Sequence, residues 1–234
     1  MPVAFQTISN TTYASRTDTT ITAPTGIVNG DLLLMFFITL AGTEAPDPTA
    51  PAGFAVTPGA WPADVSAGGF NLEFRSFYKF ASSESGDYLV THATASSQGV
   101  LLRISGAHAT APFSPTPTLN ANSGVVAEDT TATGLTTSVA DCLIVLAAFD
   151  WGDTTNNLVP PTGSTPTFTE RLDVAISFIA TGMMVTAAAT GDKTFANNSL
   201  LVNPWGASLL AIAPATGSPV PLAYTQKRMV GRAY

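Results

Sequence analysis

The chain has 234 residues, of which 45% are apolar and only 11% charged, and its formal net charge at neutral pH is −7. This length allows one large all-β domain or two small ones, and the acidic balance argues against binding nucleic acid by neutralising its phosphates. The 19 glycines and 17 prolines follow no period, which excludes collagen-like and solenoid folds.

Short runs of β-branched and aromatic residues alternate with turn residues along the whole chain, which predicts strands and no long helix. In chain order we expect strands over residues 5–9, 19–22, 32–40, 71–80, 88–93, 99–105, 138–150, 172–179, 182–186, 193–196 and 206–213. The runs LLLMFFI and CLIVLAAF are apolar on both faces, as expected for central strands that are covered twice.

The run FNLEFRSFYKF has the alternation of a strand with two different faces. Phe70, Leu72 and Phe74 face one way, whereas Glu73 and Arg75 face the other way, as do Phe77 and Lys79. This half-polar face predicts an antiparallel sheet that is wet on one side.

The two halves of the chain resemble each other. GDLLLMFFI, which contains Asp31, is echoed by ADCLIVLAAF, which contains Asp141, and the Gly-Asp turn at Asp87 is echoed at Asp192. Each of the turns at Asp87 and Asp192 is followed by a polar segment and then by a strand with the pattern Leu-Leu-x-Ile. The halves could be two small domains. We favour one sandwich, because each half offers too few strands to bury both faces of its apolar strand.

The predicted fold is therefore an all-β, antiparallel, jelly-roll-like β-sandwich built from two similar halves, with an extended C-terminal arm. The sandwich spans 1–213, with halves of about 1–106 and 138–213 and a crossover at 107–137. Residues 214–234 form a linker and a docking arm.

Four short motifs, in this order, resemble a β-sandwich recurrent in virion structural proteins of tailed bacteriophages. They are Gly30-Asp31-Leu32-Leu33, Pro51-Ala52-Gly53-Phe54, Tyr78-Lys79-Phe80-Ala81 and Glu84-Ser85-Gly86-Asp87-Tyr88. The resemblance covers about 22–214 and does not extend to 218–234. It implies a tail-tip, fibre-associated or capsid-decorating protein, often a trimer.

No motif for catalysis or cofactor binding is present, so we expect neither an enzyme nor a bound cofactor or metal. The sequence lacks G-x-S-x-G and a phosphate-binding loop, and His92 and His108 have no ligand cluster around them. Cys142 lies in an apolar run and is expected in the core. The neighbouring carboxylates of Glu128 and Asp129 are expected in a solvated loop.

Two tryptophan-bearing loops are candidates for glycan binding, because aromatic rings stack on sugars while carboxylates and amides hydrogen-bond their hydroxyls. The candidate residues are Trp61, Asp150, Trp151, Asp153, Asn156 and Asn157. The alternative is a turn whose tryptophan packs over the sandwich edge. Oxygen ligands of this kind would also suit Ca²⁺. Trp205, at a strand start, is expected in the core.

The C-terminal segment differs in charge from the body. It holds three of the nine Lys and Arg residues, so six basic residues face all sixteen acidic residues in the rest of the chain. We expect either a solubilising tail or an arm that docks on a partner. The docking residues would be Tyr224, Lys227, Arg228, Met229, Val230, Arg232 and Tyr234.

These features predict a non-enzymatic virion component of a tailed phage, made in the host cytoplasm without a signal peptide. Its expected partners are capsid or tail proteins, other copies of itself in a trimer, and host surface glycan, with no nucleic acid and no membrane insertion. A carbohydrate-binding adhesion module is the alternative, and a β-sandwich glycan hydrolase or lyase is a third possibility.

Overall fold

The structure is a computed structural model that describes residues 2–42, 47–59, 63–67, 70–123, 130–150, 165–195 and 204–215. These residues form antiparallel strands and turns with no helix, which confirms the predicted all-β class. The jelly-roll connectivity stays a prediction. The strands are β1 (Ala4–Asn10), β2 (Ala14–Ile21), β3 (Leu32–Ala41), β4 (Ala55–Val56), β5 (Ala63–Ala67), β6 (Phe70–Phe80), β7 (Tyr88–Ser105), β8 (Thr118–Ser123), β9 (Thr130–Ala132), β10 (Cys142–Asp150), β11 (Thr169–Val174), β12 (Ser177–Met184), β13 (Lys193–Phe195) and β14 (Pro204–Ile212).

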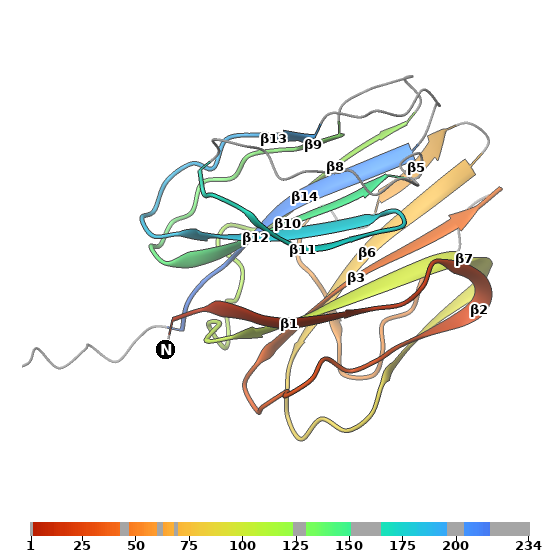
Figure 1. The fold of residues 1–234 in the computed structure, drawn as a ribbon, viewed down its shortest axis with the longest axis horizontal. Helices are drawn as coiled ribbons and strands as arrows, with labels where there is room; N and C mark the ends of the chain where they lie inside the picture. The colour runs from red at the N-terminus through yellow and green to blue at the C-terminus, as the bar shows by residue number, and fades with distance from the viewer. Residues whose placement is uncertain are drawn as a thin grey trace, which may run out of the picture.

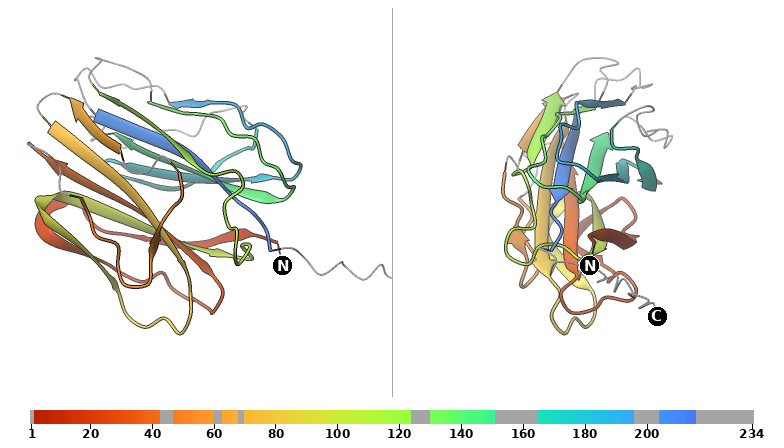
Figure 2. Two further views of the ribbon diagram at one scale, coloured as in Figure 1. Left: turned by 180° about the vertical axis from the view of Figure 1, so that it is seen from behind. Right: turned by 90° about the vertical axis from the view of Figure 1, so that its left-hand side faces the viewer.

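Two large sheets make up the body (Figure 1). The first has the order β1-β7-β3-β6-β4, with β2 added to β7 and β5 added to β6. The second has the order β11-β12-β10-β14-β8, and a small third sheet pairs β13 with β9. The two further views in Figure 2 show the warm-coloured first sheet lying against the green and blue second sheet.

The central strands β3 and β10 are buried on both faces, as predicted for doubly apolar runs. In β3, alternate residues such as Leu34 and Phe36 enter the core between the sheets, whereas Leu33 and Phe37 enter a second cluster outside the first sheet. In β10 the same alternation divides the residues between the shared core and an outer cluster of the second half. Each half thus covers its own outer face, and the inner faces cover each other.

The two halves match strand by strand. Central β3 pairs with β6 and β7, just as central β10 pairs with β12 and β14. The edge strands β1 and β8 extend the two sheets at matching places. The Gly-Asp turns match as well, because Asp87 Oδ1 accepts a hydrogen bond from the amide of Ala23 at 3.1 Å and Asp192 Oδ1 accepts one from that of Gly134 at 2.7 Å. The internal similarity in sequence therefore corresponds to a repeated arrangement of strands.

The halves pack with their strand orders reversed, as in a twofold dimer. On one side β5 contacts β8 and β6 contacts β14. On the other side Arg171 of β11 contacts the Phe5 ring of β1. Ser177 of β12 donates a buried hydrogen bond to Gln98 of β7 at 2.7 Å. A Cβ on Gly206 would lie 2.7 Å from the Phe74 ring, so this close approach of β14 to β6 requires glycine.

Strand β7 was predicted as two strands and is one. Its first part pairs with β2, and its second part lies between β1 and β3. Gly99 stands where the layer containing β2 meets the sheet, and a Cβ there would lie 2.3 Å from Ile21. The polar residues Ser97 and Gln98 are buried within this strand.

Three further predictions are corrected. The single strand expected at 172–179 is the hairpin of β11 and β12, whose turn places Ala175 at a positive φ of 50°. The segment 107–137 is more than a crossover, because β8 and β9 lie in it and join the second half. The polar face of β6 is not wet, because Glu73 and Phe77 on that face are buried beneath the outer layer.

Candidate functional site

Of the predicted glycan-binding residues, only Asp150 is among those that the structure describes. Asp150 ends β10 and is buried; its carboxylate accepts a hydrogen bond from the Thr130 hydroxyl at 3.4 Å, and its amide donates to the Ile176 carbonyl. This carboxylate faces the interior. The other candidates, Trp61, Trp151, Asp153, Asn156 and Asn157, lie outside the described residues. So do the docking residues Tyr224, Lys227, Arg228, Met229, Val230, Arg232 and Tyr234.

Three of the four motifs meet in one group of side chains, which we call the motif cluster: Phe54, Lys79, Glu84 and Tyr88. The Lys79 ammonium lies 2.8 Å from a Glu84 oxygen, and the Tyr88 hydroxyl donates to Glu84 at 2.9 Å. The Phe54 and Tyr88 rings meet edge to face with centroids 5.3 Å apart, and Lys79 lies within 6 Å of both. The motifs therefore encode one contact network between a loop, a strand end and a turn.

Two members of the motif cluster, Glu84 and Tyr88, have shifted pKa values. Burial alone would raise the pKa of Glu84, but hydrogen bonds from Lys79, the Ser82 amide and Tyr88 outweigh it and lower this pKa. Burial, followed by the neighbouring Glu84 carboxylate, raises the pKa of Tyr88 far above its usual value. The arrangement thus favours an ionised Glu84 between a charged lysine and a neutral tyrosine.

The fourth motif forms a turn at the start of β3 that several hydrogen bonds hold in place. Asp31 is buried, and its Oδ2 accepts hydrogen bonds from Arg103 Nε at 2.5 Å and from the Val28 amide at 3.0 Å. The backbones of Gly30 and Asp31 also exchange hydrogen bonds with Ala81, at the end of the Tyr-Lys-x-Ala motif. This aspartate has a structural role.

A surface cavity of about 490 Å³ lies beside the motif cluster, between the loop at 50–52 and the start of β7. Its lining includes Lys79 and Glu84, which form an ion pair with each other. The Tyr88 ring, which also lines it, is buried. A ligand there would have to break existing pairs, so this cavity is a weak candidate for binding.

The histidines and the cysteine have structural roles. His92 is buried, with Nδ1 bonded to the Ala93 carbonyl at 2.7 Å and Nε2 to the Thr19 hydroxyl at 2.9 Å. The ring of His108 accepts backbone amide hydrogen bonds within its own loop. Cys142 is buried, and both its burial and the neighbouring Asp141 raise its pKa, which disfavours the reactive thiolate.

A buried ion pair lies on the outer face of β6. Glu73 is fully buried, with Oε1 2.6 Å from Arg75 Nη2, yet neither carboxylate oxygen makes a hydrogen bond of good geometry. The same Arg75 nitrogen lies 2.6 Å from Asp47, whose side chain is 76% exposed. The guanidinium thus links a buried carboxylate to a surface one.

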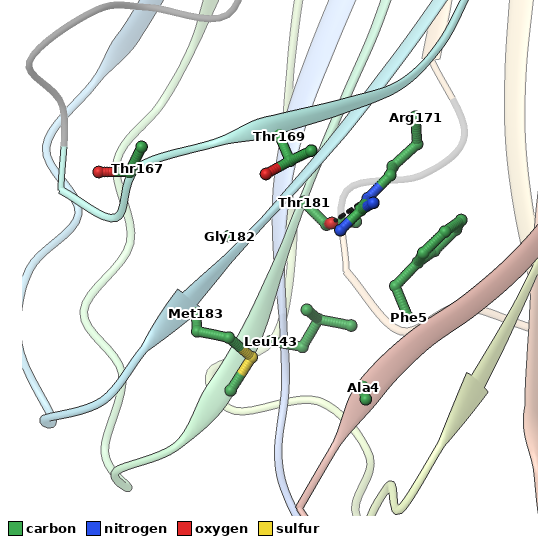
Figure 3. A pocket seen from close by; sticks show the side chains of 9 residues that line it. All are labelled: Ala4, Phe5, Leu143, Thr167, Thr169, Arg171, Thr181, Gly182 and Met183. Carbon is green, nitrogen blue, oxygen red and sulfur yellow. Dashed lines mark hydrogen bonds between the residues drawn. The ribbon is translucent and has the colours of Figure 1, made fainter.

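A cavity of about 230 Å³ lies between the halves, and nothing local in the sequence indicated it (Figure 3). Its one charged lining residue is Arg171 of β11, which is exposed to solvent. The guanidinium stands 4.5 Å from the centroid of the Phe5 ring of β1, and its Nε donates to the Thr181 hydroxyl at 2.8 Å. Residues far apart in the sequence thus build this site.

The part of the chain that the structure describes holds no group of three His, Cys, Asp or Glu side chains placed to bind a metal ion. The described residues also include no helix that could cross a membrane. No protein family, curated protein or solved structure matches this chain.

Proposed function

We propose that the protein is a non-enzymatic structural component of a tailed-phage virion, attached to capsid or tail and assembled as a trimer. The observation that carries the proposal is the motif cluster. Motifs that resemble those of phage sandwich proteins lie at separate positions in the sequence, yet Phe54, Lys79, Glu84 and Tyr88 contact one another. Such a network explains why these residues would occur together in one class of fold.

The chemistry of the described side chains supports a role other than catalysis. Three acidic side chains form ion pairs with basic ones: Glu84 with Lys79, Asp31 with Arg103, and Glu73 with Arg75. Each of these groups stabilises a turn or a strand, and none of them is a nucleophile paired with a base.

Attachment to the virion would use the basic segment that ends the chain. The body carries an excess of acidic residues, whereas Lys227, Arg228 and Arg232 follow a proline-bearing linker. A segment outside the sandwich strands can bind a partner without disturbing the core, and three copies on one trimer would bind with a high effective concentration.

Immunodetection of the protein in density-purified particles from the producing cells tests this proposal. We expect the full chain in the particle fraction, and we expect a chain ending at Ala215 to fold but to be absent from particles. The matched variant Lys227→Gln/Arg228→Gln/Arg232→Gln keeps the length and removes the charge. Absence of the full chain from particles would refute the virion role, and equal incorporation of the shortened chain would refute the anchor.

A further inference from the structure

The cavity in Figure 3 lies at one open side of the sandwich, between the two sheets. It is bordered by β1 and β11, each of which pairs with a single neighbour and ends its sheet in the described structure. The matching place on the opposite side of the sandwich is where β5 contacts β8. On the side of β1 and β11, the cavity holds the charged side chain of Arg171.

Two contacts hold the Arg171 guanidinium in position. The Phe5 ring supports its face, and Thr181 accepts a hydrogen bond from Nε. The Nη1 and Nη2 groups donate to no described side chain, and no carboxylate oxygen of the described residues lies within ion-pair distance of them. Arg171 thus has no acidic partner among the described residues, although the chain has nearly twice as many acidic as basic residues.

The rest of the lining offers hydroxyl groups and a small apolar surface. Thr167, Thr169 and Thr181 line one side, and Leu143 and Met183 line the other (Figure 3). Threonine hydroxyls can both donate and accept hydrogen bonds. The wall depends on Gly182 of β12, where a Cβ would lie 2.6 Å from the Thr167 carbonyl oxygen.

We propose that this cavity binds the carboxylate end of an acidic sugar, with Arg171 as the carboxylate-binding residue. The two guanidinium nitrogens that donate to no described residue match the two oxygens of a planar carboxylate. A single cation suits a singly charged group better than a doubly charged phosphate, particularly because Glu170 and Asp173 share its strand. The threonines would hydrogen-bond the sugar hydroxyls. The volume, below that of drug-sized pockets, fits one residue of a longer chain.

This site is independent of the virion role, since binding can be measured on the purified protein. Calorimetric titration with glucuronate, glucose and inorganic phosphate separates a carboxylate site from a neutral-sugar site and from a general anion site. We expect saturable binding of glucuronate, and at least about tenfold weaker binding of the other two probes, because a charge-assisted bidentate pair contributes an energy of that size.

Arg171→Gln should weaken glucuronate binding at least about tenfold, and Arg171→Lys should also weaken it because the planar fork is lost. The control is Arg16→Gln, which removes the same charge from an arginine of β2 that donates to the Thr12 carbonyl. Thermal unfolding of each variant establishes that it folds. Absence of saturable glucuronate binding, equal binding of phosphate, or unchanged binding by Arg171→Gln would overturn the proposal.

Discussion

The ion pair between Glu73 and Arg75 predicts a large effect of a single substitution. Arg75→Met removes the positive charge but keeps much of the side-chain length. It leaves Glu73 fully buried and without the one cation that contacts it. A carboxylate in that position loses its compensating charge while its desolvation cost remains.

The structure separates the two contacts that Arg75 makes. The contact with Asp47 is to a side chain that is 76% exposed, and solvent screening limits its contribution to about 1 kcal/mol or less. The contact with buried Glu73 is different, because breaking such a pair from one side costs roughly 3–5 kcal/mol. We therefore expect Arg75→Met to lower the free energy of unfolding by roughly 3–5 kcal/mol at neutral pH.

Urea denaturation followed by tryptophan fluorescence measures this free energy. Asp47→Asn is the control and should cost no more than about 1 kcal/mol. The double variant Glu73→Met/Arg75→Met should be more stable than Arg75→Met alone by at least about 2 kcal/mol, since no charge is left buried. Equal losses in Arg75→Met and Asp47→Asn, or no rescue in the double variant, would refute the reasoning.

Three other effects follow from the described geometry. Gly99→Ala should cost about 1–3 kcal/mol in urea denaturation through its clash with the outer layer, whereas Gly42→Ala, with nothing near its Cβ, should change stability by less than about 0.5 kcal/mol; equal effects would contradict this. Because the pKa of Glu84 is lowered in the folded state, its stabilisation is present above the ordinary glutamate pKa and is lost as the pH falls through the folded value. The destabilisation by Glu84→Gln should therefore be large at neutral pH and shrink in acid, and a penalty independent of pH would show that the charge is irrelevant. Cys142 should resist iodoacetamide in the native protein and react after denaturation, as mass spectrometry can measure; rapid labelling of the native protein would contradict its burial.

The sequence predicted the central strands because their burial leaves a local pattern. LLLMFFI and CLIVLAAF are apolar at every position, and both are buried on two faces in the structure. The short strands β4 and β9 carry no such pattern, since two or three residues cannot display a period. The hairpin turn at Ala175 was also missed, because alanine gives no signal of a positive φ.

The candidate sites were less predictable than the fold because their residues come together from distant positions. The four sequence motifs already contained Phe54, Lys79 and Glu84, but only the structure shows that Phe54 and Glu84 contact the same ammonium group. Phe5 and Arg171 lie on different halves of the chain, and neither belongs to a recognisable motif. Their contact depends on how the two sheets pack, which no window of the sequence contains.

The repeat of the two halves explains how residues of both halves come to line the Arg171 cavity. Two similar sheets packed in reversed order create two matching sides, one between β5 and β8 and one between β1 and β11. On the first side β5, which pairs with β6 as β11 pairs with β12, contacts β8. On the other side Phe5 of β1 and Arg171 of β11 border the cavity. The reversed packing of the two halves therefore brings residues from both of them to this cavity.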